Sequence, residues 1–404
     1  MSGRRGSSVD YVTRRRFLHK AAGTLVLSAT GIGYVLGQEK STGTSEQDGG
    51  LIPRQRNPDN LEFPFATLDS FITPNEKFYV RNHFAQPKVE VGSWRLKVEG
   101  AVERPLEMTL EELRKLPART VTATLECAGN ARALLLPKVK GVPWQLGAVG
   151  NAQWTGVPLG AVLERAGLRD SAVEVVLEGA DSGEITAETR PAGAIPFARS
   201  LPLVKARAPE VLLAYQMNAV DLPPAHGFPL RAIVPGWYGV ASIKWLRRLV
   251  ITDRPFNGFF QSFDYSYFQV ANGLPRVVPI TELQVKSQIA RPAAGEVIKP
   301  DANYRIYGAA WTGESEIAKV EVSTDGGKRW TEARLLGDKG RSGRPARHAW
   351  CLWDYQWHTP EAASEGRIMA RATDARGQVQ PLERDGNRRN YMVSHVLPVD
   401  VIIR

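Results

Sequence analysis

One of the two cysteines stands in a position suited to chemistry, in the segment LECAGNAR at residues 125–132. The strand-like run RTVTATLE leads to Cys127 and a turn of small residues follows it, so the thiol can point from a sheet end into a cleft. Thiolate sulfur is a soft ligand for transition metals. A lone cysteine is nevertheless more often a small apolar core residue. Cys127 by itself leaves both interpretations open.

Segments elsewhere in the chain carry side chains of the kinds that bind anions. Upstream, FYVRNHF (residues 78–84) combines an arginine, an asparagine and a histidine, and downstream HGFPLR and SIKW add further cations and donors. A phosphate or another oxyanion requires fixed cations and hydrogen-bond donors of this type. Taken singly, His226 is also consistent with closing a turn, and Lys244 with a surface lysine whose stem covers Trp245.

In their order along the chain, from about residue 78 to about residue 376, these segments resemble the sulfite oxidase family of molybdenum-pterin enzymes. The C-A-G-N segment matches the family's metal-binding cysteine, so the resemblance implies Cys127 as the molybdenum ligand and molybdenum with molybdopterin as the cofactor. By the same resemblance, the residues expected to line the pterin pocket are Asn82, His83, Asp181, His226, Arg231, Ser242 and Lys244.

The resemblance also implies an oxyanion pocket beside the metal, where arginine supplies planar, bidentate donors. The residues that it implies as catalytic are Cys127, Tyr265, Arg81, Arg132, Trp144 and Arg389. Tyr267 is close enough to Tyr265 to leave the register of that match open, and Arg388 is an alternative to Arg389. Ala131 stands where family members often carry a second arginine.

The function that the resemblance implies is oxidation of sulfite to sulfate by oxygen-atom transfer, with electrons passed to a separate acceptor such as a c-type cytochrome. A homodimer formed through the C-terminal domain is expected. Sulfane-sulfur dehydrogenation and nitrate reduction are alternatives on the same scaffold, because one fold serves several reactions. Sulfoxide reductases are disfavoured, since they resemble only the first domain. An alternative of another class is a non-catalytic exported binding protein.

The elements that must position these residues are mostly strands. Alternation predicts a strand over 93–102, and β-rich runs follow at RTVTATLE, SAVEVVLEG, EVLLAYQMN, FPLRAIVPG and SIKWLRRLVIT. TLEELRKL predicts a short helix with a capping box formed by Thr109 and Glu112, and a second helix should run from Pro158 to a stop at Gly167. Strands outnumber helices without βαβ alternation, so the predicted fold class is mixed α+β.

Beyond about residue 280 the pattern changes to strands separated by turns, as in YRIYGAAW, HAWCLWDYQW and GRIMARATDARGQVQ. This texture is typical of an immunoglobulin-like β-sandwich. The predicted organisation is a signal segment at 1–37, a linker at 38–60, a molybdopterin-binding catalytic domain at 61–279 and a dimerisation-type β-sandwich at 280–404. The folded part is expected to start near Phe63.

The N-terminus resembles a twin-arginine export signal. TRRRFLHK is followed by the uncharged run AAGTLVLSATGIGYVLG, whose length is marginal for spanning a bilayer. That route exports folded proteins, so we expect a periplasmic or otherwise exported protein. Cleavage of the signal and a retained N-terminal anchor both stay open.

Composition narrows the remaining classes. The 404 residues carry a formal charge of +10, and half of this excess lies in residues 1–20, so nucleic-acid binding is not expected. Two cysteines, Cys127 and Cys351, exclude a disulfide framework, a four-thiolate zinc site and a four-thiolate iron–sulfur cluster within this chain. No C-x-x-C-H occurs, so no covalent haem is expected in this chain and the electron acceptor should be a separate protein.

Overall fold

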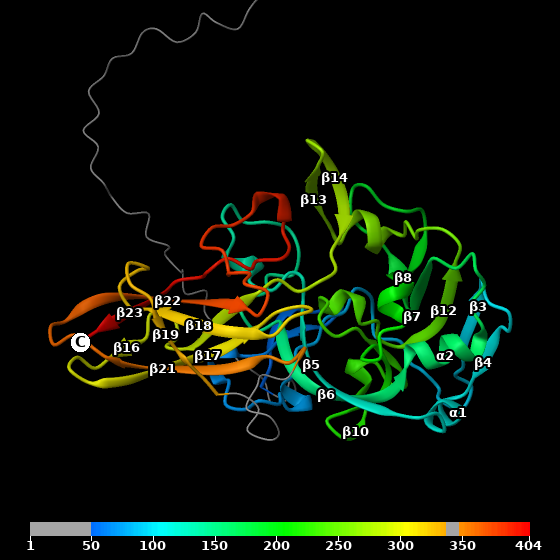
Figure 1. The fold of residues 1–404 in the computed structure, drawn as a ribbon, viewed down its shortest axis with the longest axis horizontal. Coiled ribbons are helices and arrows are strands. Elements are labelled where there is room, and N and C mark those ends of the chain that lie inside the picture. Colours follow the sequence, from blue (N-terminus) through cyan, green and yellow to red (C-terminus); the bar gives the residue numbers. More distant parts are fainter. Residues whose placement is uncertain (1–49, 337–346) are drawn as a thin grey trace, which may run out of the picture. The chain divides into compact units, whose positions relative to one another are not determined.

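The computed structural model describes residues 50–336 and 347–404 (Figure 1). The predicted signal segment at 1–37 lies outside the described residues. The described chain has an N-terminal domain, which contains every expected cofactor-binding residue, and a C-terminal domain of strands that begins near residue 280. The predicted α+β class with a C-terminal sandwich is confirmed.

Two five-stranded sheets form the N-terminal domain. The first has the order β4-β3-β12-β7-β8, and the second has the order β10-β9-β6-β5 with β11 paired to β9. The strands of the first sheet are β3 (Leu96–Gly100), β4 (Leu106–Met108), β7 (Glu174–Glu184), β8 (Ala194–Pro202) and β12 (Leu246–Thr252). The strands of the second are β5 (Arg119–Glu126), β6 (Val149–Pro158), β9 (Leu212–Met217), β10 (Val220–Asp221) and β11 (Arg231–Ile233). Strand β5 coincides with the predicted run RTVTATLE, so Cys127 follows directly on its last residue.

Among residues 50–336 and 347–404, three short α-helices join the strands: α1 (Leu110–Arg114), α2 (Leu159–Ala166) and α3 (Leu203–Ala206). The predicted capping box is present, because the Thr109 hydroxyl accepts from the Glu112 N–H while the Glu112 carboxylate accepts from the Thr109 N–H. Helix α2 ends at Gly167 as predicted. Within the described residues, no helix has the length and apolar character needed to cross a bilayer.

The predicted linker at 38–60 is wrong for its last part. Strands β1 (Ile52–Gln55) and β2 (Asn60–Glu62) pair there, and Leu61 also exchanges two backbone hydrogen bonds with Val80. Asn60 is fully buried, and its side-chain oxygen accepts from the Asn82 N–H at 2.9 Å. These strands are too short to show an alternation of apolar residues in the sequence. They form because they pair with each other and because β2 bonds to Val80.

The C-terminal domain is a sandwich of two sheets. One has the order β15-β17-β21-β20 and the other β16-β23-β22-β18-β19. The first contains β15 (Lys286–Arg291), β17 (Asn303–Trp311), β20 (Arg334–Leu335) and β21 (Cys351–His358), and the second contains β16 (Val297–Ile298), β18 (Ile317–Ser323), β19 (Thr331–Glu332), β22 (Ser364–Asp374) and β23 (Val399–Ile403). Both sheets contribute to one apolar core, with Ile306 and Trp353 from the first and Val320 and Ile368 from the second. A separate hairpin, β13 (Ser266–Ala271) and β14 (Leu274–Pro279), precedes this domain.

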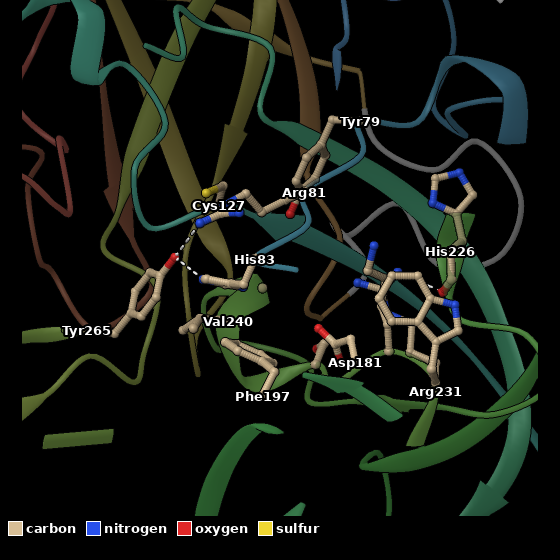
Figure 2. A pocket seen from close by; sticks show the side chains of 14 residues that line it. Tyr79, Arg81, His83, Cys127, Asp181, Phe197, His226, Arg231, Val240 and Tyr265 are labelled. Atoms are coloured by element: carbon tan, nitrogen blue, oxygen red, sulfur yellow. Dashed lines mark hydrogen bonds between the residues drawn. The ribbon is translucent and has the colours of Figure 1, made fainter. Parts of the chain in front are cut away.

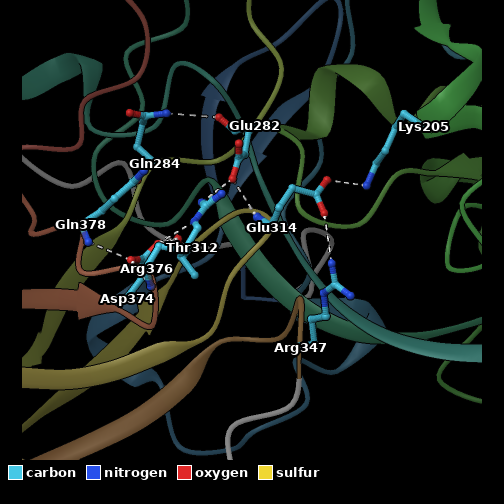
Figure 3. A network of polar contacts seen from close by, with 9 residues as sticks. All are labelled: Lys205, Glu282, Gln284, Thr312, Glu314, Arg347, Asp374, Arg376 and Gln378. Atoms are coloured by element: carbon cyan, nitrogen blue, oxygen red, sulfur yellow. Dashed lines mark hydrogen bonds and ion pairs between the residues drawn. The ribbon is translucent and has the colours of Figure 1, made fainter.

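Polar contacts join the two domains (Figure 3). Lys205 Nζ lies 2.6 Å from a carboxylate oxygen of Glu314. Glu282, in the connecting segment, accepts from the Glu314 N–H at 2.9 Å and from the Arg376 guanidinium at 2.6 Å. The apolar core also continues across the junction, where Trp311 and other C-terminal residues join the cluster of the N-terminal domain. The C-terminal domain therefore packs directly against the elements that carry the site.

Candidate active site

A cavity of about 600 Å³ lies in the N-terminal domain (Figure 2). Its lining residues are Tyr79, Arg81, His83, Cys127, Asp181, Phe197, His226, Arg231, Gly239, Val240, Ser242, Lys244, Trp245 and Tyr265. Nine of the residues predicted from the sequence are in this set: Arg81, His83, Cys127, Asp181, His226, Arg231, Ser242, Lys244 and Tyr265. The structure thus brings together residues that are far apart in the chain.

Cys127 is held in the turn after β5. Its N–H donates to the Ala148 carbonyl at 2.9 Å, and its carbonyl accepts from the Asn130 N–H at 2.9 Å. The Asn130 side chain closes the same turn by accepting from the Ala148 N–H at 3.1 Å. Cys127 is 6% exposed, and neither it nor Cys351 forms a disulfide. A buried free thiol that faces a cavity is available as a metal ligand.

Arg81, His83 and Tyr265 gather at the Cys127 end of the cavity (Figure 2). The Tyr265 hydroxyl shares a hydrogen bond of 2.7 Å with His83 Nε2 and accepts from Arg81 Nη2 at 3.3 Å. Burial raises the pKa of Tyr265 to about 12, so this hydroxyl keeps its proton at neutral pH. Burial, and then the charge of Arg81, lower the pKa of His83 well below its ordinary value. This end therefore offers a thiol, a fixed cation and a protonated hydroxyl.

Cations gather at the other end of the cavity. Arg231 Nη1 donates to the His226 carbonyl at 3.1 Å, and Lys244 Nζ donates to the Ala225 carbonyl at 2.9 Å and to the Asn82 side chain. Burial lowers the pKa of Arg231 to about 10 and that of Lys244 well below its usual range, where the charge of Arg231 adds to the effect. Burial likewise raises the pKa of Asp181 to about 6, against the pull of Lys244. Because several cationic side chains are buried together here, the cavity favours an anionic ligand.

The donor set fits the expected molybdopterin. Arg231 Nε is buried and, within the described part of the chain, has no hydrogen-bond partner, so a donor is left for a ligand atom. The thiol at one end and the cations at the other suit a cofactor with a metal at one end and a phosphate at the other. Cys127 would hold the metal, and Arg231 with Lys244 would hold the phosphate.

Asn82 and Arg132 were predicted in the site but do not line the cavity. Asn82 is buried and supports it indirectly, since its side-chain oxygen accepts from Lys244. Arg132 lies behind the Cys127 turn, where its guanidinium donates to the carbonyls of Asn390 at 3.0 Å and Val142 at 3.3 Å. It fits there because a β-carbon on Gly129 or Gly141 would come within 2.5 Å of it.

Trp144 also lies outside the cavity lining. It is fully buried, and its ring meets the ring of Tyr79 edge to face with centroids 6.4 Å apart. Tyr79 itself lines the cavity, so Trp144 supports that wall. Its Nε1 has no hydrogen-bond partner among residues 50–336 and 347–404.

The C-terminal arginines differ from the prediction as well. Arg389 is exposed, and its Nη1 donates to the Phe263 carbonyl at 3.1 Å and to Ser266 at the base of β13. The Arg388 guanidinium lies 4.5 Å from the centre of the Tyr267 ring. Neither arginine lines the cavity, and Tyr265 rather than Tyr267 does. Arg388 and Arg389 therefore contact the segment next to Tyr265 without lining the cavity themselves.

Sequence reasoning missed several lining residues. Tyr79 and Trp245 belong to FYVRNHF and SIKW, two segments that the sequence already assigns to the site, so both could have been included in the prediction. Phe197, whose ring stacks on His83 with centroids 4.1 Å apart, lies in β8 without any local signal. Gly239 and Val240 likewise carry none, because only the tertiary structure brings them to the cavity.

Two family models match the chain: the oxidoreductase molybdopterin binding domain over residues 83–260, and the Mo-co oxidoreductase dimerisation domain over residues 277–397. Sulfite oxidase of Gallus gallus is 39% identical over 359 residues, which cover 85% of this chain and 76% of that protein. Mitochondrial sulfite oxidase of Rattus norvegicus is 37% identical, and the match covers 80% of this chain and 60% of that protein.

Among solved structures, the sulfane dehydrogenase SoxCD of Paracoccus pantotrophus resembles the chain with a TM-score of 0.72 and 29% identity. The match covers 85% of this chain and 84% of that one. The similarity thus includes both the domain that carries the cavity and the domain that follows it.

Proposed function

Because the chain belongs to the sulfite oxidase family of molybdopterin-dependent oxidoreductases, and is therefore an enzyme with a molybdopterin cofactor, we propose that it oxidises sulfite to sulfate. The observation that carries the proposal is the buried Cys127 thiol beside Arg81 and the hydrogen-bonded pair Tyr265 and His83. When bound, the molybdenum centre supplies oxygen-atom transfer and accepts two electrons.

The protein's own residues bind and orient the anion. Arg81 provides a cationic donor whose position is fixed by its hydrogen bond to Tyr265. The Tyr265 hydroxyl, held by His83, keeps a proton available as a donor toward an oxyanion. Burial strengthens both interactions relative to water. The site therefore favours a small, multiply charged oxyanion.

Sulfane-sulfur oxidation is the second candidate. The similarity to the sulfane dehydrogenase SoxCD, which covers most of both chains, favours it. Nitrate reduction stays a further alternative from the sequence. The alternative of a non-catalytic exported binding protein is wrong, since the chain is an enzyme of this family.

We also propose how the enzyme is placed and assembled. Electrons pass to a separate protein such as a c-type cytochrome, and the chain forms a homodimer, which the match to a dimerisation domain over residues 277–397 supports. The N-terminal resemblance to a twin-arginine signal supports export to the periplasm.

Substrate assays on metal-loaded protein test the proposal. The protein is purified from a host that makes the molybdenum cofactor, and its molybdenum content is measured. Turnover of sulfite, thiosulfate and nitrate is then compared, with ferricyanide as oxidant for the first two and a reduced dye as donor for nitrate. Sulfite should give the highest kcat/KM. Turnover of thiosulfate or nitrate without turnover of sulfite would reject sulfite as the substrate.

A further inference from the structure

One face of the hairpin β13–β14 is apolar and uncovered. In the antiparallel register Phe268 is opposite Val277, and Val270 is opposite Pro275. Because side chains alternate along a strand, these four residues share one face. Phe268, Val270 and Val277 are 46%, 62% and 53% exposed. Figure 1 shows the hairpin extending beyond the neighbouring strands. We call these four residues the ribbon face.

The opposite face of the hairpin is mostly polar and is contacted at its base, although Leu274 at its tip is 71% exposed. The ring of Tyr267 lies under the Arg388 guanidinium, 4.5 Å away, and Gln269 accepts from Arg276 at 2.7 Å. An isolated two-stranded hairpin is marginally stable in water, so a partner that covered this apolar face would also stabilise the hairpin. A contiguous exposed apolar patch of this kind marks an interaction site.

The ribbon face is continuous with the active site. Strand β13 begins one residue after Tyr265, which lines the cavity, and Arg389 fixes the base of the strand through Ser266. Tyr265 in turn packs on Tyr391 of the C-terminal segment, with ring centroids 4.9 Å apart. A molecule bound to the ribbon face would therefore lie beside the wall of the cavity that contains Tyr265.

Cations surround this region. Arg276 belongs to the hairpin, and Arg388 and Arg389 contact it. Lys140 is joined to the same segment, since its carbonyl accepts from the Asn390 side chain at 3.1 Å. Two carboxylates lie in the same region: Asp385 pairs with Arg388 at 3.1 Å, and Asp264, next to Tyr265, accepts from the Tyr391 hydroxyl at 2.7 Å. The cations named above outnumber them. The surroundings are therefore positive and complement an acidic partner.

We propose that the ribbon face docks the electron acceptor, a small redox protein with an acidic surface around an apolar patch at its cofactor edge. The inference rests on the proposed function, which requires a separate acceptor. Electron-transfer encounters are among the smallest protein interfaces, below about 1,200 Å² in total, whereas obligate homodimer interfaces bury about 2,000 Å² or more in total. Four partly exposed side chains match the smaller class.

The test combines binding with turnover. Phe268→Ser together with Val277→Ser removes apolar area from the ribbon face, and Val204→Ser is the matched control because Val204 is 88% exposed on α3. The probe is a c-type cytochrome with an acidic haem edge, titrated calorimetrically at low ionic strength. The double variant should weaken cytochrome binding about ten-fold or more, since a few residues at the centre of an interface carry most of its binding free energy. The control should bind as the wild type does.

Turnover separates docking from chemistry. Sulfite oxidation with ferricyanide, which needs no docking surface, should be unchanged in the double variant, while kcat/KM for cytochrome reduction falls with the binding. Equal cytochrome affinity in the wild type and the double variant would overturn the proposal, as would failure of the wild type to bind the probe. Because binding is measured without turnover, it tests docking even if sulfite is not the substrate.

Further measurements on the same two proteins test two other possible partners of the ribbon face. Sedimentation analysis of both proteins shows whether the double variant converts a dimer to monomers, which would assign the ribbon face to a second copy. Co-sedimentation with anionic lipid vesicles that is lost in the double variant would assign it to a membrane surface. Either result would overturn docking of a redox protein, and unchanged oligomeric state with no vesicle binding supports it.

Discussion

Glu126 and Lys286 form a buried ion pair between the two domains, with Lys286 Nζ 2.9 Å from Glu126 Oε1. Glu126 is the last residue of β5 and precedes Cys127 directly. Its other carboxylate oxygen accepts from Trp311 Nε1 at 2.9 Å, and Lys286 and Trp311 are opposite each other in β15 and β17. Asn130, in the Cys127 turn, donates to the same carboxylate at 3.0 Å. The C-terminal domain therefore holds the turn that carries the thiol.

Removing one partner of this pair should be costly. Lys286→Met leaves an uncompensated buried carboxylate, which destabilises a protein by about 3–5 kcal/mol. Adding Glu126→Gln to Lys286→Met should recover part of that loss, because no buried charge is then left unpaired. Urea unfolding measures both. The sulfur-to-molybdenum absorption of the loaded single variant should also change, because Glu126 is adjacent to the ligand.

Lys205→Met is the matched control, since Lys205 also pairs across the domain junction but with the more exposed Glu314. It should leave the absorption spectrum unchanged. A single Lys286→Met variant as stable as the wild type would show that the pair does not hold the turn.

Cys127→Ser should abolish turnover while the protein stays folded. Oxygen replaces the soft thiolate, and the turn itself depends on backbone and Asn130 hydrogen bonds that serine preserves. Pterin content should remain substantial, since the cations at the far end of the cavity are untouched. Cys351→Ser is the control, because Cys351 is buried in β21 of the other domain. A sulfite oxidation rate near that of the wild type would contradict Cys127 as the ligand.

Arg231→Gln should lower the cofactor content. Losing a charge-assisted hydrogen bond in a buried pocket costs about 1.5–3 kcal/mol, or roughly ten- to a hundred-fold in affinity. Molybdenum analysis and pterin fluorescence measure the loss. The control is Arg247→Gln, whose side chain is 48% exposed and pairs with Glu178. Equal cofactor content in the two variants would remove Arg231 from the binding site.

Arg81→Gln should raise the KM for sulfite about ten- to a hundred-fold with the molybdenum content retained, because one charge-assisted contact to the anion is lost. Arg114→Gln, an exposed arginine paired with Asp221, is the control. Arg389→Gln compares the sequence prediction with the structure. Its guanidinium donates to the carbonyls of Phe263 and Ser266 outside the cavity lining, so the KM should change far less than in Arg81→Gln. Equal effects of the two substitutions would restore Arg389 to the anion pocket.

The stability of the cofactor-free protein should fall with acid through His226. Burial, then the charges of Arg231 and Lys244, lower the pKa of His226 to about 3 from an ordinary value near 6.5. A group with a lowered folded-state pKa contributes stability that is present above pH 6.5 and is lost as the pH falls toward 3. Because neutral glutamine cannot titrate, His226→Gln should show a weaker fall over this window.

Denaturant unfolding at several pH values measures the difference between the two proteins. His395, whose pKa is lowered to about 4 chiefly by burial, is present in both and cancels. An identical pH dependence in the wild type and His226→Gln would mean that His226 does not titrate in this range.

Features governed by local sequence were predictable. The strand RTVTATLE, the Thr109–Glu112 capping box and the stop at Gly167 depend on side-chain and backbone preferences within a few residues. Cys127, Arg231 and Lys244 could also be predicted as site residues, because a thiol and two cations are suited to binding a metal and an anion. All three line the cavity.

Long-range packing determined the rest. The space beside Gly129 and Gly141 holds the Arg132 guanidinium, which does not line the cavity. Strand β1 forms inside the apparent linker because it pairs with β2, which in turn bonds to Val80. Nothing near Lys286 in the sequence indicates that it is buried against Glu126, 160 residues away. Short-range patterns specify which conformation a segment prefers, but the direction of a side chain and the burial of a charge depend on distant partners, which only the folded chain supplies.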